Sequence, residues 1–165
     1  MREGWMETTL GELAEVQMGL QLSPTRREGT RLRPYLRAAN IIEQRLSTVD
    51  VNEMDFSAAE EMRYRLEVGD VLLVEGGNDK SLGMPARVDR EQAGLCIQNT
   101  LIRLRAKDRE VVDPCYLHLI CRQLFETRVF QHMGKGTTIL HLGGSRVPGV
   151  SCHLPPPVSY THLTL

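Results

Sequence analysis

One segment of this chain carries a strong helix signal, while the apolar segments around it are short and bounded by turn residues. We expect this helix to begin after Asp113, a good N-cap, with Pro114 at its first position. It should run to about Met133 and stop at Gly134, a natural C-cap. Apolar residues at helical spacing predict one buried face, formed by Leu117, Ile120, Leu124 and Phe125. We expect this apolar face of the helix to pack against a β-sheet.

Two capping boxes predict shorter helices. Thr9 with Glu12 indicates a helical turn at 9–14, and Ser57 with Glu60 indicates a helix over about 58–65. Turn signals and β-branched residues delimit the expected strands, which are 15–22, 35–42, 71–74, 86–88, 95–104, 137–142 and 150–154. Strands that do not alternate regularly with helices indicate an α+β fold. We expect a strongly twisted mixed or antiparallel β-sheet with one long helix and one or two short ones.

Length and composition favour one soluble domain. A chain of 165 residues buries roughly 70% of its unfolded surface on folding. No apolar run approaches the roughly 20 residues that cross a bilayer, and the N-terminus lacks an apolar signal core. Four cysteines show no disulfide spacing, which suits reduced thiols in a cytoplasmic protein.

Charge is unevenly distributed along a chain whose net charge is −1. The segment 20–46 has six basic and two acidic residues, 47–79 has two basic and nine acidic, and 80–146 has eleven basic and six acidic. A chain organised in this way could present one basic and one acidic face. The simpler interpretation is that these charges solvate an ordinary surface.

The sequence contains no complete catalytic or metal-binding motif. The glycines around Lys135 lack the glycine that a phosphate-binding loop needs five residues earlier, where Val129 stands. Cys115, His118 and Cys121 are spaced by three residues on the expected helix, so the outer pair diverges by about 120° around its axis. No fourth metal ligand lies nearby, and nothing specifies an oxyanion hole for a cysteine nucleophile. We therefore expect no metal, no cofactor and no enzymatic activity.

Side chains that read base edges occur instead on expected loops and strand ends. Arg reads guanine, Asn and Gln read adenine, and Ser or Thr read either base, while Lys and Arg nearby bind phosphates. The glycine-rich loop 76–83 carries such residues, and so does the strand at 35–42. The candidate DNA contacts are Arg37, Asn40, Asn78, Lys80, Ser81, Lys135 and Arg146. For Asn40, as for Gln98 and Asn99, a structural role in a strand bend is the alternative.

Six motifs in order resemble the target-recognition domain of type I restriction-modification specificity subunits, over about residues 5–157. They are Trp5 with Thr9 to Glu12, Arg37 to Ile41, Gly69 to Val74, the loop 76–83 with the strand that follows it, the long helix, and the Pro-rich segment 153–157. The resemblance implies a single, non-catalytic domain that reads double-stranded DNA. In the full-length protein it would direct methyltransferase and restriction subunits, its partners, to their site, with no membrane contact.

The end of the chain departs from this pattern. We expect residues 1–157 to form the recognition domain of a truncated fragment, because the long spacer helix of the family does not follow. Residues 158–165 are similar to the translation of a transposon-end sequencing adapter, so we expect a non-native tail. A natural C-terminal strand is the alternative.

Two other functions fit the residues. The domain could belong to a single-chain restriction-methylation enzyme, although no methyltransferase motif lies within this sequence. It could also be a non-DNA module that binds a small ligand, with the glycine-rich loop as the rim of its pocket.

Overall fold

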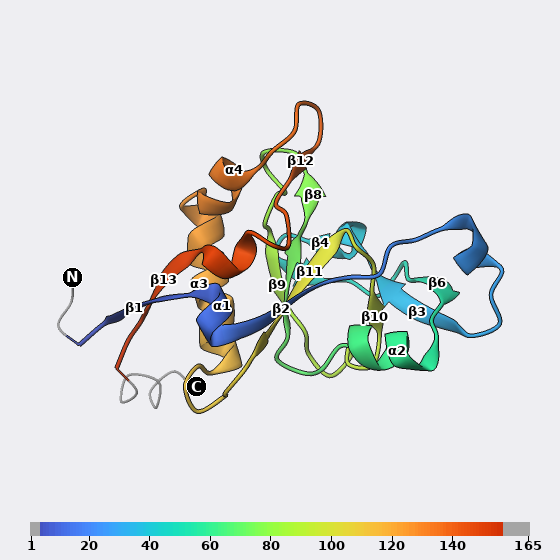
Figure 1. Ribbon diagram of the computed structural model, residues 1–165, viewed down its shortest axis with the longest axis horizontal. Helices are drawn as coiled ribbons and strands as arrows, with labels where there is room; N and C mark the ends of the chain where they lie inside the picture. Colours follow the sequence, from blue (N-terminus) through green and yellow to red (C-terminus); the bar gives the residue numbers. More distant parts are fainter. Residues whose placement is uncertain (1–3, 157–165) are drawn as a thin grey trace.

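The computed structural model describes residues 4–156, which form a mixed fold of small β-sheets with the main helix, α3 (Pro114–Glu126), on one side (Figure 1). The helices are α1 Leu10–Leu13, α2 Ala58–Tyr64, α3 Pro114–Glu126 and α4 Val129–Met133, with 3-10 turns at Pro24–Arg27, Ala38–Asn40 and Val147–Gly149. The first strands are β1 Met6–Thr9, β2 Ala14–Met18, β3 Leu32–Leu36, β4 Ile41–Ile42, β5 Arg45–Leu46 and β6 Asn52–Asp55. The remaining strands are β7 Val71–Val74, β8 Gly76–Gly77, β9 Pro85–Arg87, β10 Cys96–Ile97, β11 Leu101–Ala106, β12 Leu140–His141 and β13 Ser151–Leu154. The expected non-native tail lies outside the described residues.

The largest sheet has the order β2-β11-β7-β9, and its neighbouring strands are all antiparallel. Its centre is β7, whose four residues Val71–Val74 are all buried, as the unbroken apolar run predicted. α3 lies against β7, β9 and β11, and buries Leu117, Ile120 and Leu124 in the main core. The predicted apolar face of this helix is therefore confirmed.

A second sheet has the order β10-β3-β6, in which β3 runs parallel to β10 and antiparallel to β6. Its small core contains Tyr35, Met54, Phe56 and Cys96. The capping boxes predicted at Thr9 and Ser57 are present at the starts of α1 and α2. The expected α+β class is confirmed, although the β-structure is divided among several small sheets.

The predicted helix over 114–133 is broken, which corrects the expectation. α3 ends at Glu126, and Arg128 adopts a left-handed conformation with φ of 64° before α4 begins. The change of direction brings Phe130 into contact distance of Gly83, whose positive φ of 74° only glycine adopts readily. Phe130 is fully buried. Burial of this ring outweighs the cost of one left-handed residue, and no local sequence signal announces the break.

Four predicted strands are shorter than expected, among them 15–22, which ends at Met18, and 137–142, of which only Leu140–His141 is a strand. The strand at 35–42 ends at Leu36, because the backbone then forms a 3-10 turn over Ala38–Asn40. The strand at 95–104 is divided into β10 and β11 by a turn in which the Leu101 amide donates to the Gln98 carbonyl at 3.0 Å. Within residues 4–156, no helix is long and apolar enough to cross a membrane.

Candidate nucleic-acid interface

An arm projects from the main sheet, at the top of Figure 1. We define the arm as residues 76–83 and 129–141, which include β8, α4 and β12. β8 pairs antiparallel with β12, with Gly77 opposite Leu140 and Gly76 opposite His141. This pairing joins two segments that lie about 60 residues apart in the sequence. It brings four of the seven candidate DNA contacts, Asn78, Lys80, Ser81 and Lys135, onto one structural unit.

The loop at the start of the arm is held by its own polar side chains. Asn78 Oδ1 accepts hydrogen bonds from the backbone amides of Lys80 at 2.9 Å and Ser81 at 3.1 Å. Ser81 Oγ in turn accepts from the backbone amide of Asn78 at 3.1 Å. Asn78 is exposed, and its side-chain nitrogen has no hydrogen-bond partner among the described residues. The side-chain oxygen therefore orders the loop while the amide donors face solvent.

The arm carries two unpaired positive charges. Lys80 and Lys135 are exposed, and neither ammonium group has a partner within residues 4–156. Asp79 lies between the candidates in sequence, but its carboxylate pairs with Arg128 at 2.5 Å. Asp79 is the acidic residue of the arm, and this ion pair neutralises it. The remaining formal charge of the arm is therefore positive.

Arg146 forms hydrogen bonds with the backbone of the arm. Its guanidinium donates to the carbonyl of His141 at 2.8 Å and to the carbonyl of Met133. These two carbonyls flank the hairpin that contains Lys135. Arg146 thus connects both ends of the hairpin. The same guanidinium N–H groups were predicted to contact DNA, and here they bind backbone carbonyls.

A buried carboxylate that the sequence analysis missed fixes the base of the arm. Glu75 is 9% exposed, and its Oε2 lies 3.0 Å from Nδ1 of His141. Its Oε1 accepts a hydrogen bond from the Gly143 amide at 3.4 Å. The only sequence signal for this role was an acidic residue placed directly after the buried run 71–74.

The other two candidates lie away from the arm and serve the fold. Asn40 is 2% exposed, and its Oδ1 accepts from the Arg37 amide at 2.9 Å. Its side-chain nitrogen donates to the carbonyls of Ser47 at 3.0 Å and Asp50 at 2.8 Å. Arg37 pairs with the Asp50 carboxylate at 2.6 Å. For Asn40 this agrees with the structural alternative of the sequence analysis, whereas the role of Arg37 in a DNA contact stays a prediction, since its ion pair with Asp50 lies at the surface.

Four of the six arginines in segment 20–46 are in ion pairs, which favours the simpler interpretation of their clustering, whereas Arg27 and Arg45 are exposed and have no ion-pair partner among the described residues. Arg26 pairs with Glu60 at 2.7 Å, while Arg31 and Arg33 pair with Glu61 at 2.9 and 3.0 Å. The hydrogen bond from Arg26, with that from the Ser57 amide, lowers the pKa of Glu60 to about 2. Three carboxylates of the acidic segment 47–79, Asp50, Glu60 and Glu61, therefore neutralise part of the basic segment through partly exposed ion pairs.

The cysteines and histidine of α3 do not assemble a metal or nucleophile site. Burial lowers the pKa of His118 to about 4 and raises that of the fully buried Cys121. Cys115 accepts a hydrogen bond from Arg87 at 2.5 Å, and burial raises its thiol pKa. No group of three or more His, Cys, Asp or Glu residues in the described part of the chain is placed to hold a metal ion.

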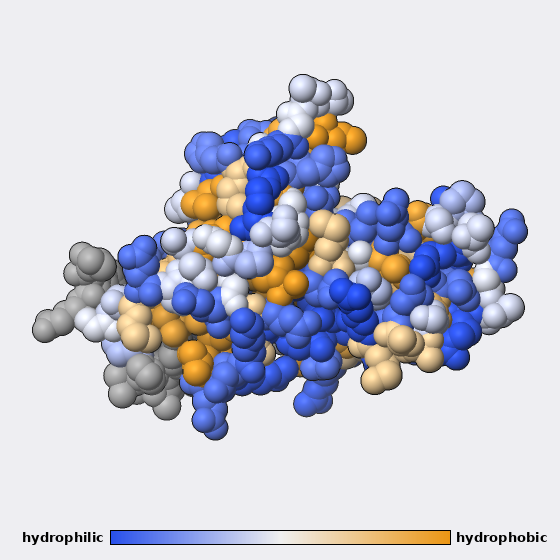
Figure 2. Space-filling model, in the orientation of Figure 1, coloured by the Kyte–Doolittle hydropathy of each residue, from blue (hydrophilic) through white to orange (hydrophobic). Residues whose placement is uncertain are grey.

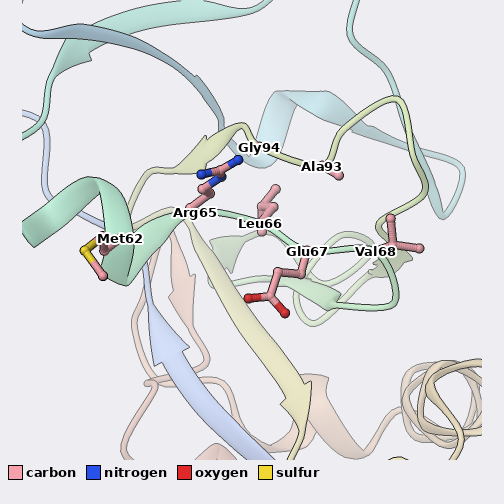
Figure 3. A pocket seen from close by; sticks show the side chains of 7 residues that line it. All are labelled: Met62, Arg65, Leu66, Glu67, Val68, Ala93 and Gly94. Carbon is pink, nitrogen blue, oxygen red and sulfur yellow. The ribbon is translucent and has the colours of Figure 1, made fainter. Parts of the chain in front are cut away.

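A shallow hollow of about 480 Å³ lies at the end of α2, away from the arm (Figure 3). Its lining residues come from two segments, 62–68 and 93–94. None of its lining residues belongs to the glycine-rich loop 76–83. The hollow therefore does not match the small-ligand alternative, which required that loop as a pocket rim.

Comparison with known proteins places this fold among restriction-modification proteins. The S subunit of a type I restriction-modification system from M. genitalium matches with a TM-score of 0.60 and 16% identity, over 91% of this chain and 34% of that one. The HsdS subunit from Thermoanaerobacter tengcongensis matches with a TM-score of 0.64 and 20% identity, over 94% of this chain and 39% of that one. A chain from a structure that describes complex assembly and conformational transition of the type I R-M system matches with a TM-score of 0.63 and 20% identity. The match covers 99% of this chain and 37% of that one. No family model and no curated protein matches the sequence.

The described chain therefore shares the fold of part of the solved type I specificity subunits, as its ordered motifs predicted. It spans little more than a third of the length of these solved chains.

Proposed function

We propose that this chain recognises double-stranded DNA in a sequence-specific manner, as a target-recognition domain of a type I specificity subunit. The observation that carries the proposal is the fold shared with three solved chains of type I systems, over 91–99% of its length. The six ordered motifs support the same proposal, because they are features of the residue sequence and do not depend on the backbone path.

The arm supplies the chemistry that such a reader needs. Lys80 and Lys135 suit phosphate contacts, which position a protein on DNA without reading sequence. The free amide donors of Asn78 suit a base edge, since they extend from a loop that their own oxygen holds rigid. Rigid support lowers the entropy lost on binding.

The proposal also extends to the complete protein. There the domain would direct methyltransferase and restriction subunits to their site, and it would itself contribute no catalysis. Titration of labelled random duplex DNA at low and moderate salt tests the DNA-binding step, since phosphate contacts release counterions and make affinity fall with salt. Absence of binding at low salt, or an affinity that salt leaves unchanged, would contradict the proposal.

A further inference from the structure

Ile139 is an apolar residue held in solvent on the arm. It is 57% exposed, within a loop closed by two hydrogen bonds, from Lys135 N to His141 O at 3.1 Å and from His141 N to Lys135 O at 2.9 Å. Figure 2 shows apolar surface close to the top of the arm, next to hydrophilic and neutral residues. Of the nine large apolar side chains that are exposed among the described residues, Ile139 is the one that lies on the arm, beside its unpaired lysines.

The loop fixes the position of Ile139. Gly136 has a φ of +139°, and a Cβ at this position would lie 2.1 Å from the Ile139 carbonyl oxygen. Only glycine allows the two backbone segments to approach so closely. Arg146 holds the carbonyls at both ends of the loop. The isoleucine therefore stands on a braced turn, and little further ordering is needed when it meets a partner.

The surroundings of Ile139 are complementary to DNA. Lys135 in the same loop and Lys80 in the neighbouring loop are exposed and unpaired within the described chain. Thr137 and Thr138 precede Ile139, are exposed, and form no side-chain hydrogen bond within residues 4–156. Positive charge, free hydroxyls and one apolar group therefore lie next to the two-stranded β8–β12 pair, and the DNA major groove admits a two-stranded ribbon.

We propose that Ile139 makes an apolar contact with the C5-methyl group of a thymine in the major groove. This inference rests on the proposed DNA-binding function and adds a specific reading residue to it. The methyl group is the one apolar feature by which base pairs differ in that groove, and it is absent from the minor groove. The contact would favour thymine over cytosine at one position of the bound sequence.

Replacement of single thymines by deoxyuridine tests this contact, because it removes the methyl group and preserves base pairing. The probe is the duplex that the full chain enriches from a random pool. At the position that Ile139 reads, we expect deoxyuridine to weaken binding about threefold to fivefold, in line with the burial of one methyl group. The Ile139→Ala variant should bind the thymine duplex more weakly by a similar factor and should be insensitive to deoxyuridine there.

Ile42→Ala is the matched control, because Ile42 is also 57% exposed and lies on the separate β4–β5 hairpin. This variant should keep the full sensitivity to deoxyuridine. The contact is refuted if the wild-type chain tolerates deoxyuridine at every position, or if Ile139→Ala remains as sensitive as wild type. Sequence-selective binding without methyl dependence would overturn this inference alone, whereas failure to bind any duplex at low salt would overturn the proposed function as well.

Discussion

The side chain of Thr100 accepts a hydrogen bond from the backbone amide of Ala38, across a donor–acceptor distance of 3.0 Å. The Thr100 carbonyl accepts a second hydrogen bond, from the Glu75 amide at 2.9 Å. Ala38 lies in the motif Arg37 to Ile41, Glu75 directly follows the motif Gly69 to Val74, and Thr100 lies in the predicted strand 95–104, so the three segments are far apart in the sequence. Their order along the chain indicated a family, and the fold shows a physical reason for it: one threonine connects the turn after β3 to the base of the arm.

Thr100→Val should therefore destabilise the protein. The variant keeps the shape of the side chain but leaves the half-buried Ala38 amide without its acceptor, at a cost of about 1–3 kcal/mol. Thr100→Ser retains the hydroxyl and should lose clearly less. Urea unfolding of the three proteins measures the difference, and equal stability of the Val and Ser variants would contradict the assigned role.

Gly83→Ala should destabilise the junction between the arm and the core. A Cβ at this position would lie 2.4 Å from Cβ of Phe130, and the φ of +74° disfavours any other residue. We expect a loss of about 2 kcal/mol or more. Gly149→Ala is the matched control, because a Cβ there meets no atom within 4 Å. Thermal unfolding should separate the two variants, and a similar melting temperature for both would refute the packing argument.

Lys80→Ala and Lys135→Ala should weaken binding to all duplexes alike. If each lysine neutralises one phosphate, each substitution should reduce the slope of log affinity against log salt by about 1. Arg90→Ala removes an exposed cation that lies outside the arm, and it should leave the slope unchanged. Anisotropy titrations over a series of salt concentrations provide the measurement. An equal decrease of the slope for all three substitutions would indicate a general effect of net charge and would contradict phosphate contacts by the arm.

Acid should weaken the contact between Arg26 and Glu60. The pKa of Glu60 is lowered from 4.5 to about 2, so its contribution to stability is complete above about pH 4.5. That contribution is lost as the pH falls toward 2. Solvent screening at this partly exposed pair limits the effect to about 1 kcal/mol.

Glu60→Gln should accordingly be less stable than wild type at pH 6, and the difference should shrink between pH 4.5 and 2. Glu28→Gln is the control, since Glu28 is exposed and joins no ion pair among the described residues. Denaturant unfolding at several pH values tests the sign. A stability gap that widens toward low pH would contradict it.

The sequence predicted those parts of the fold that depend on local signals. Val71–Val74 was identified from its continuous apolar run, and the helix starts at Thr9, Ser57 and Asp113 were identified from their caps. The break at Arg128 was not predictable, because it depends on burial of Phe130 against a residue 47 positions earlier.

In the candidate interface, too, local signals were predictable and contacts between distant residues were not. Loop residues such as Asn78 were found from residue type and from the neighbouring glycines. The internal role of Asn40 and the pairing of Arg26 with Glu60 depend on partners brought close only by folding. Composition cannot distinguish a basic patch from a set of internal ion pairs, since both contain the same residues.

Selection of bound duplexes from a random pool, run in parallel with wild type and with Asn78→Asp, tests the central claim most directly. Asn78→Asp keeps the oxygen that holds the loop but replaces the exposed amide donors with negative charge. We predict that wild type enriches a short base motif and that the variant loses preference at one position of it, by about 1–3 kcal/mol. Wild-type protein that enriches no motif from the pool would contradict the account.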